Sequence, residues 1–194
     1  MKRVCVFCGS SSGVAPAYAE AASQLGHALV RSGLGLVYGG GNIGLMGVLA
    51  DAVLAEGGAV CGVIPQALAN KELAHHGVTE LRVVASMHER KALMAEMADA
   101  FIALPGGFGT LDEFCEILTW AQLGLHRKPC GLLNVRGFYD PFLGQIARAV
   151  LEGFIRPEHR AFVVVEETPE ALLRALATAA PPQVDKWIDR DRVE

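Results

Sequence analysis

The residues best suited to chemistry lie in one stretch of the chain, residues 105–113, which reads Pro-Gly-Gly-Phe-Gly-Thr-Leu-Asp-Glu. A short apolar run typical of a buried strand precedes it, and apolar residues at helical spacing follow, so a helix is expected to start near Thr110. A strand, a glycine turn and a helix start form an anion site, because the free N–H groups and the helix dipole face the ligand. No Gly-Lys-Ser/Thr follows, which excludes a Walker A loop. Glu113 would lie about one turn into the helix, close to whatever the glycines hold.

Thr110 and Glu113 also fit a structural role. The pattern Thr-x-x-Glu is a capping box, in which the two side chains accept hydrogen bonds from backbone donors at a helix start. Three glycines within four residues exceed what a cap requires, because glycine loses the most conformational entropy on folding. The stretch therefore favours a ligand site, and a capping Thr110 would help to orient Glu113.

The composition indicates an ordinary globular α/β chain. It has 194 residues, of which 52% are hydrophobic and 22 are glycine, and this suits a buried parallel sheet with tight turns. The net charge of −4 and the pI near 5.9 argue against a nucleic-acid partner. The aromatic residues are not interleaved with basic ones, so a base-stacking platform is not expected either.

The sequence predicts a cytoplasmic protein without a membrane partner. Only five apolar residues follow the basic N-terminal residues, which is too few for a secretory signal, and no run approaches the length of a membrane span. The five cysteines are then expected to be reduced thiols. Cys5 and Cys8 match C-x-x-C, but they lie in a predicted strand, where residues three apart point to opposite faces. A redox or zinc role for this pair is therefore not expected.

Strands and helices alternate along the chain. Seven short apolar runs predict strands, at residues 4–8, 36–38, 59–64, 81–84, 100–104, 129–133 and 162–165. Helical patterns separate most of them, and the least regular segment, residues 66–79, is expected to be a functional loop. The pattern predicts an α/β fold: a single Rossmann-like domain over residues 1–180, with an open parallel sheet and helices on both faces. Residues 181–194 turn polar and are expected to form a C-terminal tail.

A second glycine-rich turn follows the second predicted strand. Residues 39–44 match the G-x-G-x-x-G dinucleotide fingerprint, but the motif does not follow the first strand. The next strand also ends in Ile-Pro-Gln and not in the acidic residue that would bind a ribose. We therefore interpret the glycines of this turn, including Gly39, Gly40 and Gly41, as a second wall of a mononucleotide pocket, because the carboxyl ends of parallel strands share one edge of the sheet.

Several separated motifs in a fixed order carry a family resemblance. The run 105–113 resembles the PGGxGTxxE motif of the Lonely Guy family, with Asp112 where glutamate is familiar. The runs 39–47, 87–91 and 119–124 also resemble the family, and the likeness extends from Val4 to about Thr178. These proteins are cytokinin riboside 5′-monophosphate phosphoribohydrolases, often mislabelled as lysine decarboxylases.

The resemblance implies an activity and a set of site residues. The reaction would be hydrolysis of a purine nucleoside 5′-monophosphate, AMP or a cytokinin-type nucleotide, to free base and ribose 5-phosphate, without a cofactor or metal. The family implies that Arg90 and Glu113 are catalytic and that the protein is a homodimer. It also implies that substrate is bound by Glu72, Lys91, Gly107, Phe108, Gly109, Thr110 and Thr119. The chemistry agrees, because breaking an N-glycosidic bond builds positive charge on the sugar, which a carboxylate can stabilise.

Some assignments rest on the resemblance alone, and other functions stay open. Thr119 lies six residues past Glu113, about 240° around the helix, so one pocket in one subunit would not obviously collect both. A site shared in a dimer would explain it. A nucleotide- or cofactor-binding carrier of the same fold is the alternative to an enzyme. A decarboxylase would need pyridoxal phosphate on a lysine, and no lysine has a sequence context that marks it for that role.

Overall fold

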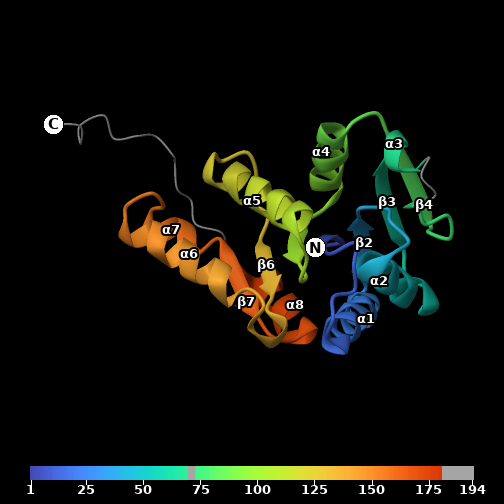
Figure 1. The fold of residues 1–194 in the computed structure, drawn as a ribbon, viewed down its shortest axis with the longest axis horizontal. Helices are drawn as coiled ribbons and strands as arrows, with labels where there is room; N and C mark the ends of the chain where they lie inside the picture. The colour runs from blue at the N-terminus through green and yellow to red at the C-terminus, as the bar shows by residue number, and fades with distance from the viewer. Residues whose placement is uncertain (70–72, 181–194) are drawn as a thin grey trace.

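The computed structural model describes residues 1–69 and 73–180. Seven parallel strands form one sheet in the order β4-β3-β2-β1-β5-β6-β7 (Figure 1). The strands are β1 (Arg3–Phe7), β2 (Gly35–Tyr38), β3 (Val60–Pro65), β4 (Glu80–Val84), β5 (Ala100–Ala103), β6 (Cys130–Leu133) and β7 (Val163–Glu166). The predicted α/β class and the open parallel sheet are confirmed.

Helices cover both faces of this sheet. They are α1 (Pro16–Arg31), α2 (Gly44–Ala55), α3 (Gln66–Leu68), α4 (Met87–Met97), α5 (Phe108–Gln122), α6 (Asp140–Leu151), α7 (Pro157–Arg160) and α8 (Pro169–Thr178), with a short 3₁₀ turn, η2 (Val135–Gly137). Apolar residues of α1, α2 and α8 pack on one face, and those of α4, α5 and α6 pack on the other. Figure 1 shows α1 and α2 on the opposite side of the sheet from α4 and α5. No helix within the described ranges has the length and apolar character to cross a bilayer.

Both faces of the central strands are buried, which explains why they appear as continuous apolar runs in the sequence. In β5 every residue is fully buried. Cys5 and Cys8 confirm the alternation expected of β1, because Cys5 packs with the α4–α5 face and Cys8 with the α1–α2 face. Their sulfurs therefore diverge.

The strand order reverses between β1 and β5, and this is where open α/β sheets bind ligands. From β1 the chain winds outward through β2, β3 and β4, and then returns to the other side of β1. The loops that follow β1 and β5 touch each other, because the N–H of Gly9 donates to the carbonyl of Pro105 at 3.1 Å. The glycine turn of residues 105–107 therefore lies beside the switch point.

Two local details differ from the sequence prediction. Helix α5 begins at Phe108, two residues before Thr110, because the N-cap residue is Gly107. The short helix α7 was not predicted; its four residues, which start with Pro157, are too few for a helical apolar pattern to appear. The proposed tail, residues 181–194, lies outside the described residues.

Candidate active site

Two charged side chains from different helices meet above the carboxyl ends of the central strands. Nη1 of Arg90, on α4, lies 2.6 Å from Oε1 of Glu113, on α5. Both side chains are nearly buried, with 11% and 10% of their surfaces exposed. A buried ion pair is costly to desolvate unless its geometry is good. Its presence at the switch point therefore marks this place as chemically unusual.

The start of helix α4 sets the direction of Arg90. The hydroxyl of Ser86 accepts a hydrogen bond from the N–H of Glu89 at 3.1 Å, and the carboxylate of Glu89 accepts one from Ala85 at 2.8 Å. The first bond satisfies a donor that the helix start leaves free, and the second ties Glu89 to the residue before the N-cap, so the Ser-x-x-Glu sequence fixes where α4 begins. Arg90 follows in the first turn and points back toward the sheet.

The guanidinium of Arg90 has partners on three sides. Its Nε donates to the carbonyl of Val63, in β3, at 3.0 Å. Its Nη1 contacts the sulfur of Met87 at 3.5 Å as well as Glu113. An arginine held by a strand, its own helix and a second helix is positioned and is not a solvated surface charge.

A cavity of about 250 Å³ opens beside this pair. Its lining combines the end of β1, the second glycine turn and the start of α5: Val6, Phe7, Cys8, Gly9, Ser10, Gly39, Met46, Arg90, Gly107, Phe108, Gly109, Thr110 and Glu113. The cavity therefore brings the two expected catalytic residues together with the turn 107–110. Phe108 stands at its edge with almost its whole side chain exposed.

The turn that enters α5 presents backbone donors to the cavity. Gly107 caps the helix without any side-chain hydrogen bond, so the N–H groups of Phe108, Gly109 and Thr110 have no acceptor within the helix. A helix start of this kind, with the positive end of its dipole, suits a phosphate. The expected capping box is wrong, because Thr110 is the third residue of the helix and Glu113 is paired with Arg90.

Gly106 and Thr110 fit closely together. A Cβ at Gly106 would lie 2.1 Å from Oγ1 of Thr110 and 2.9 Å from the backbone nitrogen of Gly9. Any side chain at position 106 would therefore push the turn away from the loop after β1. This close approach explains a glycine at that position.

Burial sets the ionisation of the site. Burial raises the pKa of Glu113 above the ordinary glutamate value, and the nearby Arg90 guanidinium counteracts the rise by favouring the carboxylate. The thiol of Cys8, in the cavity wall, has its pKa raised far above the usual range, first by burial and then by the charge of Glu113. Cys8 is consequently a neutral thiol in the wall and not a nucleophile.

The second glycine turn contributes one residue to the lining of the cavity. Only Gly39 of this turn lines the cavity. Gly40 has a positive φ of 72° and packs against Val63 and Ile64 of β3, while Gly41 packs against Met46. Gly40 and Gly41 therefore lie behind the wall and do not line the cavity.

Lys91 lies next to Arg90 in sequence but points elsewhere. Its Nζ lies 3.1 Å from Asp112 and 3.1 Å from Glu116, so it joins α4 to α5. Burial lowers the pKa of Lys91, but the bonds to Glu116 and Asp112 outweigh this effect and raise it overall. A Schiff-base lysine needs a lowered pKa, and no lysine lines the cavity formed by the described residues.

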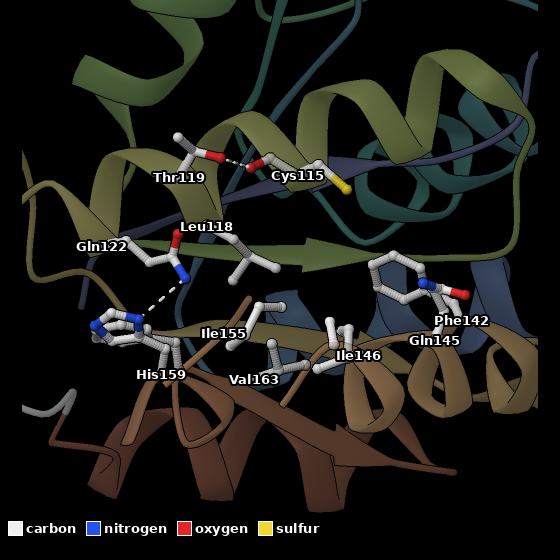
Figure 2. Close-up of a pocket in the computed structure, with 12 residues that line it drawn as sticks. Cys115, Leu118, Thr119, Gln122, Phe142, Gln145, Ile146, Ile155, His159 and Val163 are labelled. Carbon is white, nitrogen blue, oxygen red and sulfur yellow. Dashed lines mark hydrogen bonds between the residues drawn. The ribbon is translucent and has the colours of Figure 1, made fainter. Parts of the chain in front are cut away.

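Thr119 lines a different cavity, between α5 and the α6–α7 region, of about 260 Å³. Its hydroxyl donates to the carbonyl of Cys115 at 2.8 Å (Figure 2). The lining is mainly apolar and includes Leu118, Phe142, Ile146, Ile155, Phe162 and Val163. Thr119 and Glu113 thus lie in separate cavities of one chain, as the spacing along the helix indicated.

Other residues of the site escaped prediction. Cys8, Ser10 and Met46 line the cavity, and Val63 holds Arg90 through its carbonyl. The positions of Cys8 and Ser10 just after β1, next to the switch point, could have identified those two, whereas Met46 lies in α2 and Val63 lies within β3. Glu72, expected to bind substrate, lies outside the described residues. In the described part of the chain, no three His, Cys, Asp or Glu side chains are grouped so that they could hold a metal ion.

Solved structures share the fold. The molybdenum cofactor binding protein of Rippkaea orientalis superposes with a TM-score of 0.69 at 24% sequence identity, over 92% of this chain and 99% of that one. The Moco carrier protein of Chlamydomonas reinhardtii gives 0.67 at 20% identity, over 91% and 94%. At these identities the likeness shows the architecture alone.

Sequence relatives are much closer. Cytokinin riboside 5′-monophosphate phosphoribohydrolase LOG7 of Arabidopsis thaliana is 54% identical over 99% of this chain and 91% of its own length. The cytokinin riboside 5′-monophosphate phosphoribohydrolase of Rhodococcoides fascians is 54% identical, over 90% and 89%. The model of a family described as "possible lysine decarboxylase" matches residues 46–176. With such identity over nearly its whole length, the chain belongs to the family of the cytokinin riboside 5′-monophosphate phosphoribohydrolases.

Proposed function

We propose that this protein hydrolyses the N-glycosidic bond of a purine nucleoside 5′-monophosphate, AMP or a cytokinin-type nucleotide, to the free base and ribose 5-phosphate. The observation that carries the proposal is the buried Arg90–Glu113 pair, which shares one cavity with the start of α5. The names of the relatives give the same activity. In the reaction the bond from C1′ to the base nitrogen breaks, water forms a new C1′–O bond, and the base gains the proton that water loses.

The phosphate is proposed to bind at the turn 107–110. The free N–H groups of Phe108, Gly109 and Thr110 would donate to its oxygens, and the helix dipole would favour its charge. Phe108 stands exposed at the cavity edge, where a flat base or a sugar face can lie against it. Anchoring the phosphate sets how deeply the sugar enters the cavity.

Glu113 and Arg90 are proposed as the catalytic pair. Glu113 is one helical turn beyond the phosphate turn, so its carboxylate lies near the sugar ring, where positive charge develops in the transition state. A fixed carboxylate there stabilises the oxocarbenium-like sugar or directs the attacking water. Arg90 holds that carboxylate ionised and in place, and its cation lies within reach of sugar and phosphate oxygens.

Thr119 is proposed to act across a homodimer interface. The cavity that contains Thr119 is apolar, and large apolar side chains at the ends of α5 and α6 are exposed, among them Leu125, Leu151 and Phe154. A second copy placed over this face would cover them and carry its Thr119 toward the neighbouring site.

We also propose that Glu72 and Lys91 have secondary roles in substrate binding, with Lys91 acting through its bridge between α4 and α5. We propose a cytoplasmic location for the enzyme.

The dependence on phosphate tests the proposal. AMP and adenosine are compared as substrates, and the free adenine released is quantified by chromatography. If the start of α5 holds the 5′-phosphate, adenosine is cleaved far more slowly than AMP. Equal kcat/KM for the two substrates would contradict the assignment of the turn and would favour a general nucleosidase. Tight AMP binding without any adenine release would instead favour the carrier alternative.

A further inference from the structure

Gly39 lies against the guanidinium of Arg90, where no side chain fits. A Cβ built at position 39 would meet Nη2 of Arg90 at 1.9 Å and its Cζ at 3.1 Å. Ordinary contacts begin near 3.4 Å, so that nitrogen would have to retreat by about 1.5 Å. The φ of Gly39 is outside the left-handed region, so the backbone itself does not require glycine there.

The clash cannot be relieved by moving the glycine turn. The carbonyl of Gly40 accepts from the N–H of His75 at 2.9 Å, and the N–H of Asn42 donates to Leu73 at 2.9 Å. On the other side, Gly40 packs on the backbone of Val63. The turn is therefore clamped between β3 and the segment that follows residue 72.

The opposing atoms are the ends of flexible side chains. Besides Arg90, the near neighbour of a Cβ at Gly39 is the sulfur of Met46, at 3.2 Å. Methionine adapts readily to a small shift. Arg90 cannot adapt without loss, because its guanidinium is planar and rigid, with Nε bonded to Val63 and Nη1 to Glu113. Moving Nη2 by 1.5 Å therefore displaces the whole group.

We propose that Gly39 is a positioning residue, whose missing side chain leaves the space in which Arg90 holds Glu113. The turn that resembles a dinucleotide fingerprint thus acts on the site through Arg90. Only the kinetic part of this inference rests on the proposed hydrolase function. The packing part stands on the contacts of Gly39 alone.

Gly39→Ala tests the idea, with Gly35→Ala as the matched control. Gly35 begins β2, the strand that Gly39 follows, and a Cβ there meets its nearest neighbour at an ordinary 3.5 Å. Gly39→Ala should fold and should lose AMP turnover by about a hundredfold, the effect expected of a misplacement of roughly 1 Å. The loss should fall on kcat, and the acid limb of the pH profile should move to higher pH, because Arg90 no longer favours the carboxylate of Glu113. Gly35→Ala should match the parent in turnover.

A stability cycle separates positioning from a purely structural role and needs no activity. Gly39→Ala is made in the parent and in an Arg90→Met, Glu113→Gln background, which leaves no buried charge unpaired. The urea denaturation midpoint is then measured for each protein, with and without Gly39→Ala. Gly39→Ala should lower the denaturation midpoint in the parent and leave it nearly unchanged in the background, because the two sites are coupled through Arg90. Equal losses in both backgrounds would overturn the proposal, and so would parental kcat in an active Gly39→Ala enzyme. If the parent itself fails to hydrolyse AMP, the proposed function falls while the stability cycle still decides the role of Gly39.

Discussion

Replacing Glu113 by glutamine separates the charge of this residue from its shape. Glutamine has nearly the same size, and its amide oxygen can still accept the hydrogen bond that Arg90 donates at 2.6 Å. The substitution removes the negative charge and replaces one carboxylate oxygen with an NH2 group. Because Gly107 caps α5 and Glu113 takes no part in the cap, the helix start is unaffected.

The cost in stability follows from the burial of the pair. Deleting one partner of a buried ion pair costs about 3–5 kcal/mol, because the remaining charge is left without compensation. Glutamine retains a hydrogen bond, so the loss should be nearer the roughly 1.5–3 kcal/mol of a bond to a charged group. Burial also raises the pKa of Glu113, which means that the native environment disfavours the carboxylate, and the neutral amide avoids that penalty. We therefore expect a folded protein that is about 1–2 kcal/mol less stable.

The cost in activity should be larger. Removing one preorganised electrostatic group typically lowers kcat by about 10²–10³, equivalent to roughly 3–4 kcal/mol of transition-state stabilisation. The assay is release of adenine from saturating AMP, with the folded fraction checked by urea denaturation. Glu170→Gln is the matched control, since Glu170 also pairs with an arginine, Arg31, at 2.8 Å, but lies on the surface outside the cavity. Near-parental kcat in Glu113→Gln would refute the catalytic role of Glu113.

Three further outcomes are expected. Arg90→Lys keeps a positive charge but cannot bond Val63 and Glu113 together, so AMP turnover should fall by about tenfold or more without unfolding; parental kinetics would show that the fork geometry is dispensable. The catalytic form of Glu113 is the carboxylate, and burial raises its pKa. We therefore expect kcat to fall as the pH drops, with a midpoint above the ordinary glutamate pKa of 4.5. A kcat that rises toward acid pH would contradict this direction. Light scattering at micromolar concentration should report a dimer or a multiple of it, and a monomer would contradict the proposed role of Thr119.

The fold was predictable because its strands are buried on both faces. Runs such as Val4–Phe7 and Phe101–Leu104 are apolar without interruption, and most are separated by helical patterns, which specifies a parallel sheet. The start of α5 was misplaced because Thr-x-x-Glu resembles a capping box, whereas a glycine holds the N-cap position. Glycine has no side chain that could have indicated that role.

The sequence predicted the two charged residues of the candidate site but not the contacts that hold them in place. Arg90 and Glu113 are 23 residues apart, and the sequence suggested them through the family resemblance and the glycine turn. The 2.6 Å contact and the bond to the carbonyl of Val63 depend on how α4 packs on β3, which no local pattern encodes. The role of Gly39 was hidden for the same reason, because a space for another residue's side chain exists only in the folded protein.

The most direct test of the central claim is the identity of the products formed from AMP. The parent protein is incubated with AMP, and base, nucleoside, sugar phosphate and inorganic phosphate are each quantified. The proposed reaction predicts adenine and ribose 5-phosphate in equal amounts, each matching the AMP consumed. Adenosine with inorganic phosphate, or AMP that stays bound and intact, would contradict it.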